Sequence, residues 1–80
     1  MIETHHDYRG YVFSIAYVPD DPAYLVAFAD FPEVITHGES RAGAFANACE
    51  ALDLHLESLA KLGKQIPKPR HRLVVSANEK

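Results

Sequence analysis

Histidine is the side chain of this sequence best suited to acid–base chemistry, because it titrates close to neutral pH. The five histidines are His5, His6, His37, His55 and His71. His5 and His6 are adjacent, so in an extended segment their rings point in different directions and do not converge on one metal ion. His37 lies close to Glu39 and could act as an acid or a base, but the pattern around it contains no nucleophile and no second base. We therefore interpret the histidines as structural or surface residues.

Other motifs of catalysis and cofactor binding are missing from the sequence. The four glycines are scattered at positions 10, 38, 43 and 63, so there is no glycine-rich phosphate loop. The sequence contains neither paired cysteines nor an H-x-E-x-H pattern, so it shows no recognisable zinc site. The single cysteine, Cys49, is close to Glu50 and Asp53, whose charges oppose a thiolate, and we interpret it as a small buried apolar residue. We expect no enzyme activity, no metal and no cofactor.

Two carboxylates flank an aromatic residue and a proline where an apolar segment ends. Asp30 precedes Phe31 and Pro32, and Glu33 follows them. An aspartate at such a point often caps its own backbone in a turn, and residue chemistry alone favours this interpretation. The alternative is an acidic contact for a basic partner, since loops on a rigid sheet are usual contact sites.

The chain consists of an acidic body followed by a basic segment. Its 80 residues suffice for one domain, 1–80, with a core that is only just large enough. Residues 1–60 hold ten acidic residues against Arg9 and Arg41, whereas residues 61–80 hold six basic residues against Glu79. The acidic body predicts a basic partner, and the basic segment is either solvated or touches phosphate weakly. An acidic start without the apolar core of a signal peptide, and no apolar run of membrane length, predict a cytoplasmic protein that binds no membrane.

The apolar pattern predicts an α+β fold. Residues 11–18 and 23–29 are rich in aromatic and β-branched types, and a short strand at 34–37 completes an antiparallel meander. Ser40 is a good N-cap for a helix that Gly63 ends. Its apolar stripe consists of Phe45, Ala48, Leu52, Leu56, Leu59 and Leu62. A final strand at 71–75 gives the order β-β-β-α-β, with one helix packed on the sheet.

Neither of the two longer predicted strands alternates between apolar and polar residues as a sheet with one wet face does. Both faces of residues 11–18 and of residues 23–29 are largely apolar. One helix covers only one face of a sheet, so the other face is predicted to meet another chain. We therefore expect a homo-oligomer, a dimer or tetramer, formed through an edge strand or through the small residues of one face. These small residues are Ser14, Ala16, Ala27 and Ala29.

Residues 28–40, which read F-A-D-F-P-E-V-I-T-H-G-E-S, resemble the HicB antitoxin pattern F-P-D-L-P-G-x-x-T-x-G-D-T. The family's helix opening, x-E-E-A-x-x-N-A-x-E-A-L, is matched at Ala44, Asn47-Ala48 and Glu50-Ala51-Leu52, and its I-P-x-P is matched at Ile66-Pro67-Lys68-Pro69. These pieces follow in order over roughly residues 8–76. The departures from the pattern are Ala29 for a proline, Glu33 for a glycine and Gly43 for a glutamate that would complete a capping box with Ser40.

The resemblance implies a single HicB-like domain with a fold similar to part of a double-stranded-RNA-binding domain. It also implies a partner, a HicA-type mRNA-interferase toxin, which is a small basic ribonuclease that the antitoxin neutralises by covering the active site. An acidic body suits a basic partner, because complementary charge steers the encounter. On this basis Asp30, Phe31 and Glu33 are predicted to contact the toxin.

Many members of the family continue into a C-terminal DNA-binding domain. This chain ends at Lys80, so we expect no such domain and no specific DNA binding. Two alternatives stay open: a stand-alone homo-oligomer without a toxin partner, and a small RNA-cleaving enzyme that uses His37 with Asp30.

Overall fold

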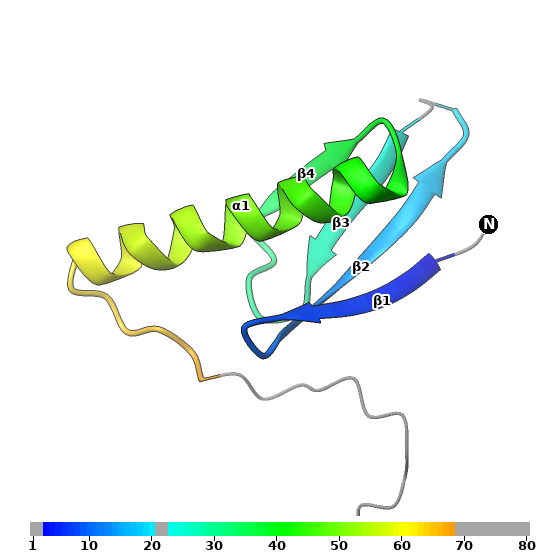
Figure 1. The fold of residues 1–80 in the computed structure, drawn as a ribbon. Helices are drawn as coiled ribbons and strands as arrows, with labels where there is room; N and C mark the ends of the chain where they lie inside the picture. Colours follow the sequence, from blue (N-terminus) through cyan, green and yellow to red (C-terminus); the bar gives the residue numbers. More distant parts are fainter. Residues whose placement is uncertain (1–2, 21–22, 69–80) are drawn as a thin grey trace, which may run out of the picture.

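The computed structural model describes residues 3–20 and 23–68, which form a four-stranded antiparallel sheet with one long helix across it (Figure 1). The strands are β1 (Glu3–Tyr8), β2 (Tyr11–Val18), β3 (Ala23–Phe28) and β4 (Ile35–Gly38), and they are neighbours in chain order. Helix α1 (Arg41–Lys61) follows β4 after two residues. The α+β class and the antiparallel meander with one packed helix are thus confirmed. The strand predicted at 71–75 lies outside the described residues.

Strand β1 is an element that the apolar pattern did not predict, because its residues carry no aliphatic side chains. It pairs with β2 in antiparallel register, from Glu3 opposite Ala16 to Tyr8 opposite Tyr11. The two strands are joined by Arg9 and Gly10, whose φ angles are 56° and 87°. Two consecutive positive φ angles are typical of the type I′ turn, whose twist matches that of a β-hairpin. The turn chemistry was therefore the local signal for this strand.

The core lies between α1 and one face of the sheet. It is formed by Tyr11, Phe13 and Ile15 of β2, Val26 and Phe28 of β3, Phe31 of the following loop, and Ala44, Ala48, Leu52 and Leu56 of α1. Burying one large apolar side chain contributes about 1.5–3 kcal/mol, so this cluster is the main source of stability. The buried stripe of α1 begins at Ala44 and not at Phe45, where it was predicted to begin. Ala44 is fully buried, whereas Phe45 is 37% exposed. At the other end Leu62 is 69% exposed and lies outside the core.

Both ends of α1 are capped as the sequence predicts. The Ser40 hydroxyl accepts a hydrogen bond from the Gly43 backbone N–H at 3.0 Å. At the other end Gly63 has a φ of 70°, which favours glycine. Its N–H bonds to the Ala60 carbonyl, and the N–H that follows bonds to the Leu59 carbonyl, which together form a Schellman motif. Within the described ranges, no helix combines the length and apolar character needed to cross a lipid bilayer.

The chain after α1 turns back toward the sheet. Ile66 packs against the core cluster. The Tyr11 hydroxyl donates a hydrogen bond of 2.6 Å to the Pro67 carbonyl. The segment after the helix is therefore tied to the start of β2, close to the turn between β1 and β2.

Candidate partner-binding site

The loop between β3 and β4 contains the residues predicted to contact a partner, and an aromatic anchor holds it on the body. Phe31 is only 2% exposed. Its ring lies 5.2 Å from that of Tyr11 and 5.1 Å, edge-on, from that of His55. The Val34 N–H donates to the Phe31 carbonyl at 2.9 Å and closes the turn. Because its side chain lies in the core, Phe31 holds the loop in place and does not offer an exposed aromatic surface to a partner.

Glu33 is the exposed carboxylate of this loop, and it is paired with the helix. Its Oε2 lies 2.8 Å from Nε2 of His55, with 57% of the Glu33 side chain and 23% of the His55 side chain exposed. The pair is 22 residues apart in sequence, so no local pattern predicts it. His55 therefore has two roles here: its ring packs on Phe31, and its Nε2 orients the carboxylate.

Asp30 lies where β3 ends, on the N-terminal side of the anchor. The pairing between β2 and β3 continues one residue past the strand, since the Ala29 N–H donates to the Val12 carbonyl at 3.0 Å. Asp30 is half-buried, whereas Pro32 and Glu33 are exposed. The structure thus brings Asp30 and Glu33 onto one short loop with Phe31 between them, as the sequence order requires.

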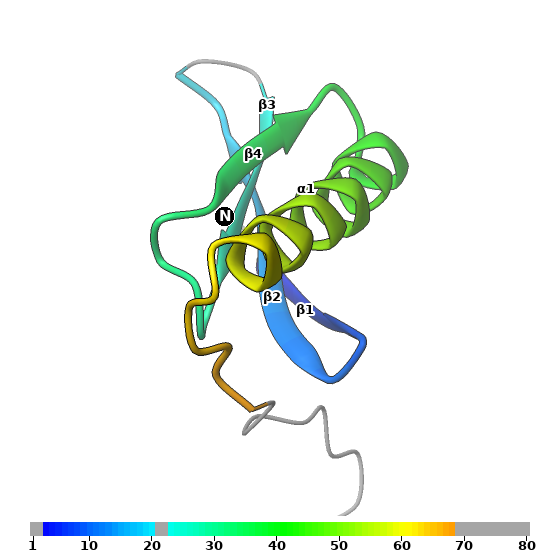
Figure 2. The same cartoon turned by 90° about the vertical axis from the view of Figure 1, so that its left-hand side faces the viewer.

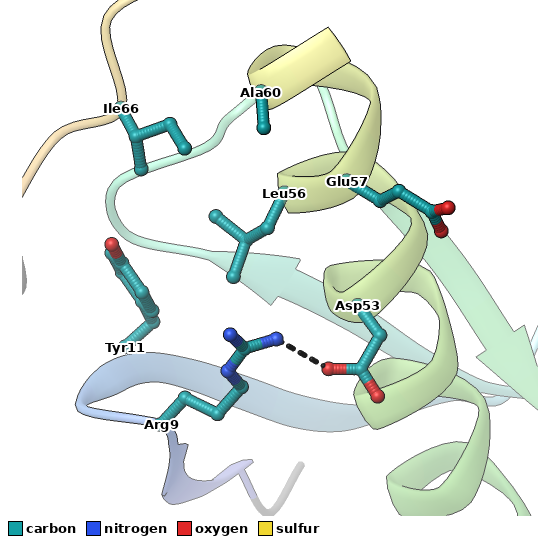
Figure 3. A pocket seen from close by; sticks show the side chains of 7 residues that line it. All are labelled: Arg9, Tyr11, Asp53, Leu56, Glu57, Ala60 and Ile66. Carbon is teal, nitrogen blue, oxygen red and sulfur yellow. Dashed lines mark hydrogen bonds and ion pairs between the residues drawn. The ribbon is translucent and has the colours of Figure 1, made fainter.

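A third acidic residue, Asp53, ties α1 to the hairpin of β1 and β2. Its two carboxylate oxygens accept hydrogen bonds from the Tyr8 hydroxyl at 3.0 Å and from the Arg9 guanidinium at 2.8 Å. The hydrogen bond to Asp53 raises the pKa of the Tyr8 phenol. Beside this cluster lies an open pocket of about 450 Å³ between α1, the hairpin turn and the segment after the helix (Figure 3). Leu56, Ala60 and Ile66 line its apolar side.

The face of the sheet that α1 does not cover is called here the open face, and it includes the small residues predicted to form an oligomer interface. Figure 2 shows α1 on one side of the sheet. The open face consists of Glu3, His5 and Asp7 of β1, Val12, Ser14, Ala16 and Val18 of β2, Ala23, Leu25 and Ala27 of β3 with Ala29 after it, and Ile35 and His37 of β4. Leu25 is 42% exposed and Ile35 is 68% exposed. Large exposed aliphatic side chains on a sheet face indicate a binding surface.

The other histidines that the structure describes and the single cysteine lie in regular elements, His5 and His6 in β1, His37 in β4 and Cys49 in α1. His71 lies outside the described residues. His6 faces the core side of the sheet, where its ring contacts those of Phe13 and Phe45, whereas its neighbour His5 lies on the open face. Cys49 is half-buried in α1, and burial, followed by the charge of Asp53, raises the pKa of its thiol. Within residues 3–20 and 23–68, no group of three or more His, Cys, Asp or Glu side chains is arranged to hold a metal ion.

The two residues of the enzyme alternative lie on different parts of the sheet. His37 pairs with Leu25 in the register of β3 and β4. Asp30 comes five residues after Leu25 along the chain. At about 3.3 Å per residue, this places the two side chains on the order of 16 Å apart along the strand direction. They do not form an acid–base pair in this structure.

An anchored acidic loop and an open apolar sheet face are features of a protein that acts by binding other macromolecules. Residues 4–80 match the family model described as the HicB-like antitoxin of bacterial toxin–antitoxin systems. The chain therefore belongs to the HicB-like antitoxin family. Membership of this family implies a regulatory, non-enzymatic protein with a toxin partner. No curated protein and no solved structure matches the chain in the same comparisons.

Proposed function

We propose that this protein binds and neutralises a small basic HicA-type ribonuclease toxin, and that the loop with Asp30 and Glu33 contacts the toxin. Membership of the antitoxin family supports a toxin as the partner. The observation that supports this particular surface is the anchored loop, in which the buried Phe31 ring and the Glu33–His55 pair hold the exposed Glu33 carboxylate, with the half-buried Asp30 on the same loop.

Neutralisation follows from the charges of the two partners. A ribonuclease surface that holds RNA is basic, because it must pair with phosphates. Carboxylates placed on such a surface occupy the same cationic groups and exclude the nucleic acid. Because Phe31 and His55 already restrict the loop, little conformational entropy is lost when Glu33 engages a cation. Glu33 is already paired with His55 at 2.8 Å, so Asp30 and Glu33 are expected to contribute unequally.

A calorimetric titration of the toxin into the antitoxin at two salt concentrations tests the surface. The test variant is Asp30→Ala with Glu33→Ala, and the matched control is Glu39→Ala with Glu50→Ala, which removes the same charge from two exposed positions outside the loop. We expect the loop variant to lose affinity and the control to keep most of it. Removing a carboxylate at the rim of an interface mainly alters the salt dependence of binding. Removing a desolvated carboxylate costs about 2–5 kcal/mol of binding free energy.

The other outcomes of this titration contradict the proposed surface in different ways. Equal losses in both variants would show that only overall charge matters. Unchanged affinity at both salt concentrations would place the contact elsewhere. Unfolding of the loop variant, seen by circular dichroism, would show that Asp30 is a structural turn residue.

The stand-alone alternative is tested by the neighbouring genes and by co-purification. A flanking open reading frame for a short, basic, histidine-containing protein that co-purifies with this chain supports the antitoxin role. For the enzyme alternative, purified protein is incubated with labelled RNA. We expect no cleavage, and cleavage that His37→Ala abolishes would refute the binding role.

A further inference from the structure

We infer that a second copy of this chain covers the open face, in a two-fold dimer whose axis runs parallel to the strands. This inference is independent of the toxin. It rests on the distribution of charge across the open face, which the strand register defines.

The register arranges the open face in rows that cross all four strands. One row consists of Glu3, Ala16, Leu25 and His37, and the next consists of His5, Ser14, Ala27 and Ile35. Each row is small or apolar in its middle. The β1 edge of the face carries carboxylates, with Asp7 two positions beyond His5, whereas the β4 edge carries an aliphatic and an imidazole side chain. The two edges therefore differ in chemistry.

A closed dimer of two stacked sheets has a two-fold axis in one of two main directions. An axis parallel to the strands reverses the order of the strands, so that β1 lies over β4 of the second copy. In that arrangement Glu3 faces the second copy's His37, and Ala16 faces the second copy's Leu25. Ser14 then faces Ala27 of the second copy. Ala16 thus meets a larger residue, Ser14 and Ala27 allow close approach in the next row, and a carboxylate meets an imidazole at both edges.

An axis perpendicular to the strands gives a less favourable contact. It keeps β1 over β1 and reverses the strand direction, so that Glu3 of one copy faces Asp7 of the other. Two carboxylates then oppose each other at each end of the β1 edge, and like charges in direct opposition are destabilising. Charge complementarity therefore selects the axis along the strands.

The shape of the open face also suits a second copy. Residues including His5, Ser14 and Ala27 line a shallow hollow of about 210 Å³. Ile35, which is 68% exposed, protrudes on the other side of the same row. With the axis along the strands, Ile35 of each copy lies over His5 of the other, at the hollow. Stacked sheets lie about 10 Å apart, a distance that small central residues and protruding edge residues fill.

The size of the face sets the expected affinity. Four strands about 4.8 Å apart and about six residues long give a flat footprint on the order of 400 Å² per copy. This is about half of the roughly 800 Å² per partner that stable complexes bury. We therefore expect a dimer with a Kd in the micromolar range rather than a tighter one.

Sedimentation equilibrium of the purified chain, from about 1 to 100 µM, tests the dimer. The test variant Ala27→Glu places a charge in the middle of the open face, and the matched control Ala46→Glu places the same charge on an exposed position of α1. We expect the wild type and the control to dimerise alike and the test variant to be monomeric. Circular dichroism checks that both variants are folded.

Substituting the two edge residues Glu3 and His37 tests the direction of the axis. His37→Glu alone brings two carboxylates together and should weaken the dimer by about 2- to 30-fold, since two exposed pairs are affected. His37→Glu combined with Glu3→Lys brings opposite charges together at the same two positions and should return the Kd to that of the wild type. With the perpendicular axis His37 does not face Glu3, so His37→Glu alone would leave the Kd unchanged, and Glu3→Lys alone would tighten the dimer because Glu3 then faces Asp7 of the second copy. Either result would show that the inferred arrangement is wrong.

Two further results would overturn the inference. A wild-type chain that is monomeric at about 100 µM has no second copy on this face. If Ala27→Glu then weakens toxin binding, the toxin is the occupant of the open face. A dimer that Ala27→Glu leaves intact uses a different surface.

Discussion

Replacing Phe31 with leucine tests whether this ring holds the acidic loop against α1. Leucine fills much of the same space, so the change removes few apolar contacts but both ring pairs, with Tyr11 and with His55. Each aromatic pair contributes about 0.5–1.5 kcal/mol beyond its buried area. We therefore expect Phe31→Leu to lower the free energy of unfolding by about 1–3 kcal/mol. This is a large fraction of the stability of a chain this size, about 4–12 kcal/mol.

The matched control is Phe45→Leu. Phe45 also has two ring neighbours, His6 and Phe13, but it is 37% exposed. Its replacement should cost less, because solvent already reaches the ring. The assay is urea unfolding followed by circular dichroism at one protein concentration, with thermal midpoints as a second measure. An effect of Phe31→Leu no larger than that of Phe45→Leu would refute the anchoring role.

Three other substitutions or treatments have defined outcomes. Gly38→Ala should severely destabilise the fold, because a Cβ there would lie 2.3 Å from the Ala44 backbone nitrogen, and a loss of the cooperative thermal transition would show it. Ser40→Ala removes the hydrogen bond to the Gly43 N–H and should lower the free energy of unfolding by about 1 kcal/mol, measured by urea unfolding. Cys49 should react with iodoacetamide more slowly in the native protein than in urea, because burial raises the pKa of its thiol. With a folded pKa above the unfolded one, the protonated thiol favours the folded state at neutral pH, and this contribution is lost as the pH rises through the folded pKa. Equal rates of Cys49 alkylation in the native protein and in urea would contradict the raised pKa of the folded thiol.

Local patterns were sufficient for most of the secondary structure. The strand at 11–18 was predicted with the observed bounds, and those at 23–29 and 34–37 are within one residue at each end. The N-cap at Ser40 and the stop at Gly63 were also correct. Such signals are local, since a cap or a turn depends on residues only a few positions apart. Strand β1 was missed because its polar side chains lack the apolar pattern that marks a strand, and because an edge strand needs little apolar surface.

The sequence by itself determined the helix, the meander and an apolar character on both faces of the sheet, because these follow from residue type and period. Only the tertiary structure decided which carboxylates are engaged: Glu33 pairs with His55, and Asp53 with Tyr8 and Arg9, across separations of 22 to 45 residues. It also decided the register that places Glu3 and His37 at opposite ends of one row. Contacts of this kind depend on how the whole chain packs, because long-range pairs form only where the sheet and the helix bring their backbones together.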